Sequence, residues 1–153
     1  MNFFSSKQPQ TDHRTSKRKL GDIGENAVCE YLKAKGFQII ETNYLKKWGE
    51  IDIVAKESSK LHFIEVKSIS REIINPNVSQ ETKREISREN LDTYRAEDNL
   101  HPHKFERLRR AIQTYVLDRH IAAETEWQFD VATVLVDEEK KLCKVSFLWD
   151  IIL

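Results

Sequence analysis

Charged side chains interrupt two apolar segments in the sequence "WGEIDIVAKESSKLHFIEVKS". They are Glu50, Asp52, Glu65 and Lys67. The segments predict an antiparallel hairpin, and a turn at residues 57–60 places Asp52 opposite Glu65 and Glu50 opposite Lys67. Because side chains alternate along a strand, all four then lie on one face at the same end of the hairpin. Two opposed carboxylates repel each other, so this register predicts a cation between them.

The chemistry expected of this cluster is metal-dependent hydrolysis of a phosphodiester. Mg²⁺ accepts carboxylate ligands and keeps waters that a substrate can replace. Lys67 would orient or deprotonate an attacking water, or stabilise charge on a phosphate. An ordinary ion pair between Glu50 and Lys67, worth about 0.2–1 kcal/mol, is the alternative, but it leaves Asp52 and Glu65 unexplained. The same register predicts that Ile51 lies on the opposite, apolar face together with Ile53 and Ile64.

Two helices and three further strands must position this hairpin. Residues 19–37 have helical spacing of apolar side chains, and Gly36 marks the end of the helix. If this helix packs on the sheet, it aims Glu25 at the metal, directly or through water; the alternative is a surface glutamate that favours the helix dipole. Residues 37–45 predict a strand, residues 101–120 an amphipathic helix, and residues 126–149 two strands around a turn. The order helix, three strands, helix, two strands predicts an α/β fold with a mixed sheet of about five strands.

Length and composition indicate one domain with a charged insertion. We expect a basic, disordered tail over residues 1–18 and a single domain over residues 19–153. Residues 70–100 are rich in charges of both signs and predict a long loop, which is either functional or disordered.

The overall charge and the cysteines limit the possible partners of the protein and its cellular compartment. The 25 basic and 25 acidic residues balance, so affinity for nucleic acid must come from local patches. Cys29 and Cys143 have no zinc-site spacing and predict buried thiols. With no apolar run long enough to span a membrane and no hydrophobic signal core, we expect a cytoplasmic protein.

The predicted helix at residues 101–120 is the candidate surface for nucleic acid. Lys104, Arg107 and Arg110 form a basic ridge away from its apolar stripe. Such a ridge could bind phosphates without reading bases, or could be a solvated charged face.

Several short motifs follow one another along the chain. They are "GxxGE" on the first helix, "GEIDIVA", "FIEVK", "HPHKFERLRRAIQTYV" and "FDVATV". In these motifs the chain resembles the YraN-like family of predicted endonucleases, within the PD-(D/E)xK nuclease superfamily. The resemblance covers residues 20–136 and implies a core of the restriction-endonuclease or Holliday-junction-resolvase type. Ile51 stands where the superfamily name has proline, and the loop at residues 70–100 is longer than the compact connection expected of the family.

The resemblance also implies a role for individual residues. Asp52, Glu65 and the backbone carbonyl of Val66 would be metal ligands, Lys67 the catalytic lysine and Glu25 a helix-borne acid. Glu50 and Asp130 would be supporting residues, and a hydrogen-bonded structural role is the alternative for Asp130.

Three functions are therefore open at the level of sequence. The first is a Mg²⁺- or Mn²⁺-dependent endonuclease that selects its substrate by structure. Its substrate would be branched or duplex DNA, or RNA, and a homodimer would suit the cutting of two strands. The second is a nucleic-acid-binding module that uses a nuclease fold without turnover. The third is a structural or interaction protein with affinity for neither metal nor nucleic acid.

Overall fold

The fold was analysed in a computed structural model that describes residues 15–73 and 102–153. Its elements in chain order are α1 (Ser16–Ala34), β1 (Gln38–Lys46), β2 (Gly49–Glu57), β3 (Lys60–Ser70), α3 (Pro102–Asp118), β4 (Trp127–Asp137) and β5 (Leu142–Leu148). This order confirms the predicted α/β architecture. The predicted loop at residues 70–100 lies almost entirely outside the described residues.

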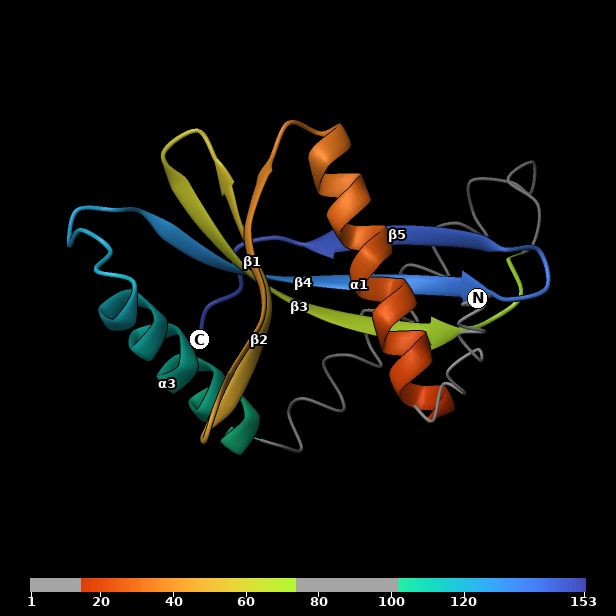
Figure 1. Ribbon diagram of the computed structural model, residues 1–153, viewed down its shortest axis with the longest axis horizontal. Helices are drawn as coiled ribbons and strands as arrows, with labels where there is room; N and C mark the ends of the chain where they lie inside the picture. Colours follow the sequence, from red (N-terminus) through yellow and green to blue (C-terminus); the bar gives the residue numbers. More distant parts are fainter. Residues whose placement is uncertain (1–14, 74–101) are drawn as a thin grey trace, which may run out of the picture.

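The five strands form one mixed sheet in which neighbours in the sequence are also neighbours in space (Figure 1). β3 and β4 are parallel, and the other adjacent strands are antiparallel. Parallel neighbours need a crossover connection, and α3 belongs to the segment that makes it. The two strands that carry the "FIEVK" and "FDVATV" motifs therefore lie side by side at the centre of the sheet.

The hairpin of β2 and β3 has the predicted register along only part of its length. Val54 lies opposite Phe63 and Lys56 opposite Leu61, as expected, but the ladder ends at the pair Ile53–Ile64. Figure 1 shows β2 turning away from β3 beyond this point. The predicted ladder pairs Asp52–Glu65 and Glu50–Lys67 do not form, because β2 continues its pairing with β1 only. Glu50, for example, lies opposite Leu45 of β1.

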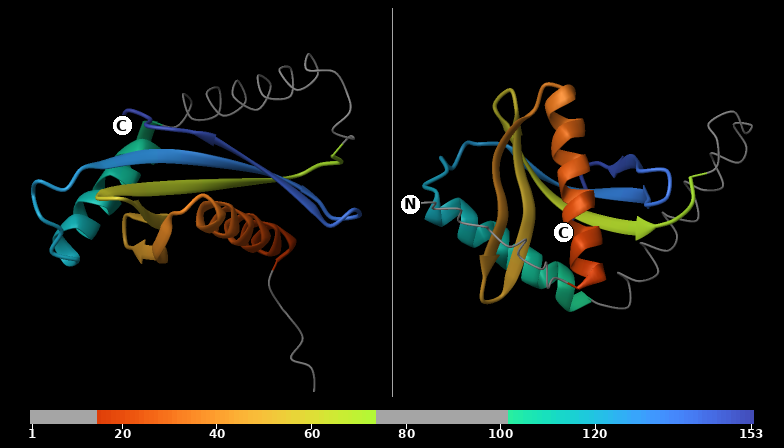
Figure 2. Two further views of the ribbon diagram at one scale, coloured as in Figure 1. Left: turned by 90° about the horizontal axis from the view of Figure 1, so that it is seen from above. Right: turned by 45° about the vertical axis from the view of Figure 1, so that its right-hand side comes forward.

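The described helices α1 and α3 pack on opposite faces of the sheet, since consecutive side chains of β3 belong to different clusters. Leu32 of α1 packs in the cluster that contains Ile64, whereas Tyr115 of α3 packs in the cluster that contains Phe63. Figure 2 shows α1 lying across β3 and β4, and α3 beside the ends of β1 and β2. Ile51 joins the α3 cluster. Its predicted place beside Ile53 is wrong, because β2 bends toward α3 after it leaves β3.

The N-terminal helix begins earlier than the predicted domain boundary. Thr15 is its N-cap, and the Thr15 Oγ1 atom accepts a hydrogen bond from the backbone N–H of Arg18 at 3.3 Å. Residues 16–18, assigned to the tail from the sequence, are therefore helical. None of the helices within residues 15–73 and 102–153 has the length and apolar character needed to cross a bilayer.

The cysteines are less buried than expected. Cys29 is half-buried in α1, and Cys143 is exposed on the edge strand β5. The prediction of two buried thiols is wrong for Cys143, because alternation on an edge strand leaves one set of side chains without a covering layer.

Candidate active site at the fork between two strands

Asp52 occupies the fork where β2 separates from β3. Its Oδ2 atom accepts a hydrogen bond from the backbone N–H of Val66 at 2.8 Å. This bond joins the "GEID" and "FIEVK" motifs beyond the last ladder pair of the hairpin. Because Glu65 and Lys67 flank Val66 in β3, the bond holds Asp52 close to both residues. It does so without the ladder pair between Asp52 and Glu65 that the sequence predicted.

Negative charge accumulates around Asp52. Burial raises the pKa of this carboxyl to about 7, and the Val66 N–H opposes that rise. The charges of Glu65, Glu25 and Glu50 each raise the Asp52 pKa further. The four carboxylates singled out in the sequence thus interact as one electrostatic cluster, even though they come from three different elements.

α1 brings Glu25 to this cluster by an unusually close approach to β3. A Cβ atom on the buried Gly24 would lie 1.7 Å from Oγ of Ser68, so only glycine permits the observed distance between helix and strand. The next residue, Glu25, is half-buried, and burial raises its pKa. A hydrogen bond from the side-chain amide of Asn43 opposes this shift. Asn43 has a φ of 53°, a left-handed conformation that asparagine tolerates better than most residues.

Glu65 has a cationic partner in α3. Its carboxylate forms an ion pair with the ammonium group of Lys104, and the Glu65 side chain is only 16% exposed. Lys67 lies two residues further along β3 and therefore on the same face of the strand. A residue of the predicted nucleic-acid-binding ridge thus contacts a residue of the predicted metal site.

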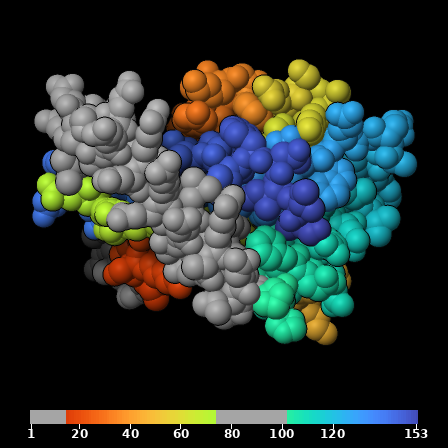
Figure 3. Space-filling view, turned by 180° about the vertical axis from the view of Figure 1, so that it is seen from behind, coloured from red at the N-terminus to blue at the C-terminus, as the bar shows by residue number. Residues whose placement is uncertain are grey.

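The other two residues of the ridge have different surroundings. The Arg107 guanidinium donates through Nε to the carbonyl oxygen of Trp48 at 3.0 Å. Gly49 packs tightly on the same turn of α3, because a Cβ there would lie 2.8 Å from the carbonyl oxygen of Arg107. Arg110 is exposed and lies 3.7 Å from a carboxylate oxygen of Glu106. Figure 3 shows α3 at the surface beside the C-terminal segment, so part of the helix remains accessible on that face.

The donor atoms suit a hard divalent cation in kind. Asp52 and Glu65 offer carboxylate oxygens near a backbone carbonyl, that of Val66, and Mg²⁺ and Mn²⁺ prefer such ligands. Within the described parts of the chain, however, no three His, Cys, Asp or Glu side chains form a group that could enclose a metal ion. Glu65 is turned toward Lys104. The residues therefore fit the metal by chemistry and charge, and Lys104 would have to release Glu65 for both carboxylates to act as ligands.

Asp130 has a different environment from these acids. It is fully buried and accepts hydrogen bonds from His62 Nδ1 at 2.7 Å, Gln128 Nε2 at 2.7 Å and the backbone N–H of Asp150 at 2.8 Å. These contacts support the structural alternative raised from the sequence. The role of His62 was missed, although its position between apolar residues in "KLHFIEV" is a usable signal, because a buried polar side chain needs a partner.

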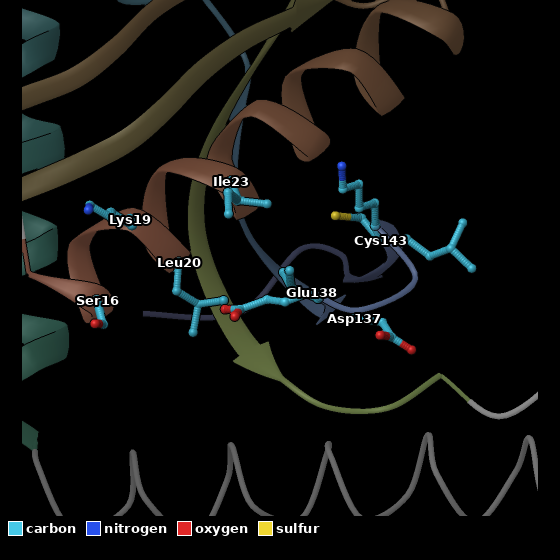
Figure 4. A pocket seen from close by; sticks show the side chains of 10 residues that line it. Ser16, Lys19, Leu20, Ile23, Asp137, Glu138 and Cys143 are labelled. Carbon is cyan, nitrogen blue, oxygen red and sulfur yellow. The ribbon is translucent and has the colours of Figure 1, made fainter. Parts of the chain in front are cut away.

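Two of the cavities in the described part of the protein adjoin α1, away from the fork. One, of about 490 Å³, separates the start of α1 from the turn between β4 and β5. Figure 4 shows Leu20 and Ile23 on its helix side, and Glu138 and Cys143 on its hairpin side. None of the site residues predicted from the sequence lines it. The other cavity adjoins His62.

Similarity to known proteins covers most of the chain. The family model described as "Uncharacterised protein family UPF0102" matches residues 24–134. The chain belongs to the UPF0102 family. A UPF0102 protein from Campylobacter lari is 34% identical over 128 residues, which cover 84% of this chain and 94% of the relative. One from Alkaliphilus metalliredigens is 30% identical over 125 residues, covering 82% and 92%.

The part of the chain that matches the UPF0102 model contains the whole acid cluster. It begins at Gly24, the glycine of the close helix–strand contact, and ends at Val134 in β4. A UPF0102 protein from Campylobacter fetus is 51% identical over a shorter stretch of 53 residues, 35% of this chain and 47% of the relative. The names of these relatives give the family and no reaction.

Proposed function

We propose that this UPF0102 protein is a Mg²⁺- or Mn²⁺-dependent endonuclease that hydrolyses phosphodiester bonds in DNA, with a preference for particular DNA structures. The hydrogen bond from the Val66 N–H to Asp52 carries the proposal. It brings an acid of one motif to the strand that bears an acid and a lysine of the other. The charges of Glu25 and Glu50 add to a negative potential that a divalent cation would neutralise.

The residues have distinct roles in this proposal. Asp52, Glu65 and the carbonyl of Val66 would hold the metal, with Glu25 as a further acid from α1. A bound divalent cation supplies Lewis-acid stabilisation of a phosphoryl oxygen and lowers the pKa of a bound water. Lys67 would orient the attacking water or stabilise charge on the phosphate. Glu50 supports the cluster from β2, and the DNA backbone would contact Lys104, Arg107 and Arg110.

Cleavage of defined DNA forms tests this function. The full chain is incubated with duplex, single-stranded, flap and four-way-junction DNA in Mg²⁺, in Mn²⁺ and in EDTA. We expect metal-dependent cutting that falls at least about a hundredfold in Asp52→Asn and in Lys67→Met, the scale on which loss of an electrostatic catalytic group acts. Lys56→Met, on an exposed position of the same hairpin, is the matched control and should cut normally. Cutting that survives both site substitutions would remove the proposal.

A nucleic-acid-binding module without turnover is the second candidate. The ion pair between Glu65 and Lys104 favours it, because this contact occupies a carboxylate that catalysis needs. Such a module would bind DNA in a salt-dependent manner, lose affinity in Arg107→Ala with Arg110→Ala, and keep its affinity in Asp52→Asn. Binding with that pattern and no cutting in either metal would decide for the module.

A further inference from the structure

A cavity of about 450 Å³ opens at the start of β3, on the face of the sheet opposite to Glu65. His62 lines it, and the alternation of side chains along β3 separates His62 from Glu65. Its walls include the rings of Tyr31, Phe37 and Trp149. The volume is within the range of small-ligand pockets.

Within the described residues, one imidazole nitrogen of His62 has a hydrogen-bond partner and the other has none. The His62 side chain is almost completely buried, and its Nδ1 lies 2.7 Å from Oδ2 of Asp130. When the imidazole is neutral, Nδ1 carries the proton, because Asp130 is an acceptor, and Nε2 then keeps a lone pair. In the described part of the protein Nε2 finds no hydrogen-bond partner, and Oε2 of Glu57 is 3.9 Å away. Buried polar atoms are rarely left this way unless something else binds them.

The aromatic walls favour a flat ligand. The rings of Phe37 and Trp149 are nearly parallel, with an angle of 15° and centroids 6.1 Å apart. Both meet the His62 ring edge-on, at centroid distances of 5.1 and 5.9 Å. Trp149 also stacks on Phe147, yet it stays 45% exposed. A planar heterocycle in this cavity would therefore contact aromatic surface and present its edge to Nε2.

The rim of the cavity adds positive charge. Lys35 and Lys60 line it together with a single acid, Glu57, whose side chain is 56% exposed. Two ammonium groups near a flat apolar wall suit a ligand that joins a heterocycle to a phosphate. Because Glu57 is at the surface, its side chain can move aside and open the path to Nε2.

We propose that this cavity binds one unpaired nucleotide. The base lies against Trp149 and Phe37 and donates a hydrogen bond to His62 Nε2, and Lys35 and Lys60 bind the phosphate. Asp130 is a positioning residue, because it fixes the tautomer of His62 without touching the ligand. The inference goes beyond phosphodiester hydrolysis, since it concerns binding on the other face of the sheet and needs no metal.

Binding of deoxyadenosine 5′-monophosphate to the full chain, in EDTA, tests the inference. We expect the nucleotide to shift the ¹⁵N resonance of His62 Nε2 and to quench tryptophan fluorescence. Trp149→Leu should weaken binding about tenfold, because stacking of one base is lost. Trp127→Leu is its matched control, since Trp127 is similarly exposed (43%) and does not line the cavity.

Further variants test the contact with the phosphate. They also test whether nucleotide binding is independent of the acid cluster. Lys60→Gln should weaken binding about fivefold, a modest loss expected for one exposed phosphate contact, whereas Lys56→Gln on the same hairpin should not. Asp52→Asn should bind the nucleotide as the wild type does, even if it cuts no DNA. The proposal is overturned if millimolar nucleotide leaves the His62 Nε2 resonance unchanged, or if inorganic phosphate binds as tightly as the nucleotide.

Discussion

Asp52 and Asp130 are both acids in strands of otherwise apolar residues, yet their surroundings differ in every respect that matters for function. Asp130 accepts three hydrogen bonds, from His62, Gln128 and a backbone N–H. Among the described residues Asp52 accepts one, from Val66, and three further carboxylates act on it. The first acid is held by donors that the fold supplies. The second lies among like charges, which raise its pKa.

This difference separates a structural acid from a candidate ligand. A buried carboxylate with enough donors stabilises a network, and removing it leaves those donors unsatisfied. A half-buried carboxylate among like charges costs stability in the absence of a cation, and such a cost is typical of functional sites. The two aspartates should therefore respond to substitution with opposite signs.

The largest effect is expected from Asp130→Ala. It removes the acceptor for three buried or half-buried donors, so the free energy of unfolding should fall by about 3–5 kcal/mol. Urea denaturation of the full chain measures this change. Asp150→Asn is the control, because its backbone N–H still donates to Asp130 and its side chain is exposed. A loss below about 1 kcal/mol would mean that Asp130 is not held in the way described.

Asp52→Asn should instead stabilise the metal-free protein. The pKa of Asp52 is raised to about 7 in the folded chain from an ordinary value of 3.8. The unfolded chain therefore loses this proton first as the pH rises, and the wild type loses stability between about pH 4 and pH 7. The asparagine has no such slope, so the variant should gain up to about 4 kcal/mol above pH 7 and nothing below pH 4. Urea denaturation in EDTA across this range measures the gain, and parallel pH profiles of the two proteins would contradict it.

The sequence predicted the order of elements and most of the hairpin, because periodicity and turn chemistry are local properties. The polar turn and the two apolar segments were enough to set the register that pairs Val54 with Phe63. They could not show that the ladder stops at Ile53, since that depends on how β2 bends to cover α3. The side on which Ile51 packs depends on the same bend. The prediction for Ile51 was therefore wrong.

The candidate site was predictable as a set of residues and much less as a set of contacts. The types and spacing of Asp52, Glu65 and Lys67 identified it, whereas the hydrogen bond from Val66 is a tertiary contact that no spacing reveals. The ion pair between Lys104 and Glu65 joins β3 to a helix more than thirty positions later in the chain. The pairing of His62 with Asp130 is equally non-local.

The third expected effect in order of size is on the free energy of unfolding, and it concerns α1, the helix that carries Glu25. Gly24→Ala puts a methyl group where Oγ of Ser68 lies, so either α1 or β3 must shift. We expect the free energy of unfolding to fall by about 1–3 kcal/mol, the usual range for overpacking. Ser68→Gly should restore part of the loss in the double variant, because it removes the atom that clashes. Gly21→Ala, in the same helix with no atom within 4 Å of the added methyl, should leave stability unchanged or raise it.

The smallest expected effect concerns Glu65, whose ion-pair partner should exchange more readily than the hydrogen-bond donors to Asp130. The donors to Asp130 are part of the folded core, but Lys104 is 44% exposed and its ion pair with Glu65 should exchange with a metal ion. Lys104→Met removes this competing cation, and the affinity for Mn²⁺ should rise about two- to fivefold, in line with the small free energy of such pairs. Titration calorimetry or Mn²⁺ electron paramagnetic resonance measures the affinity without any turnover. Arg110→Met, which removes a cation that pairs with Glu106, should leave it unchanged. A lower Mn²⁺ affinity in Lys104→Met would mean that Lys104 holds Glu65 in place for the metal and does not compete with it.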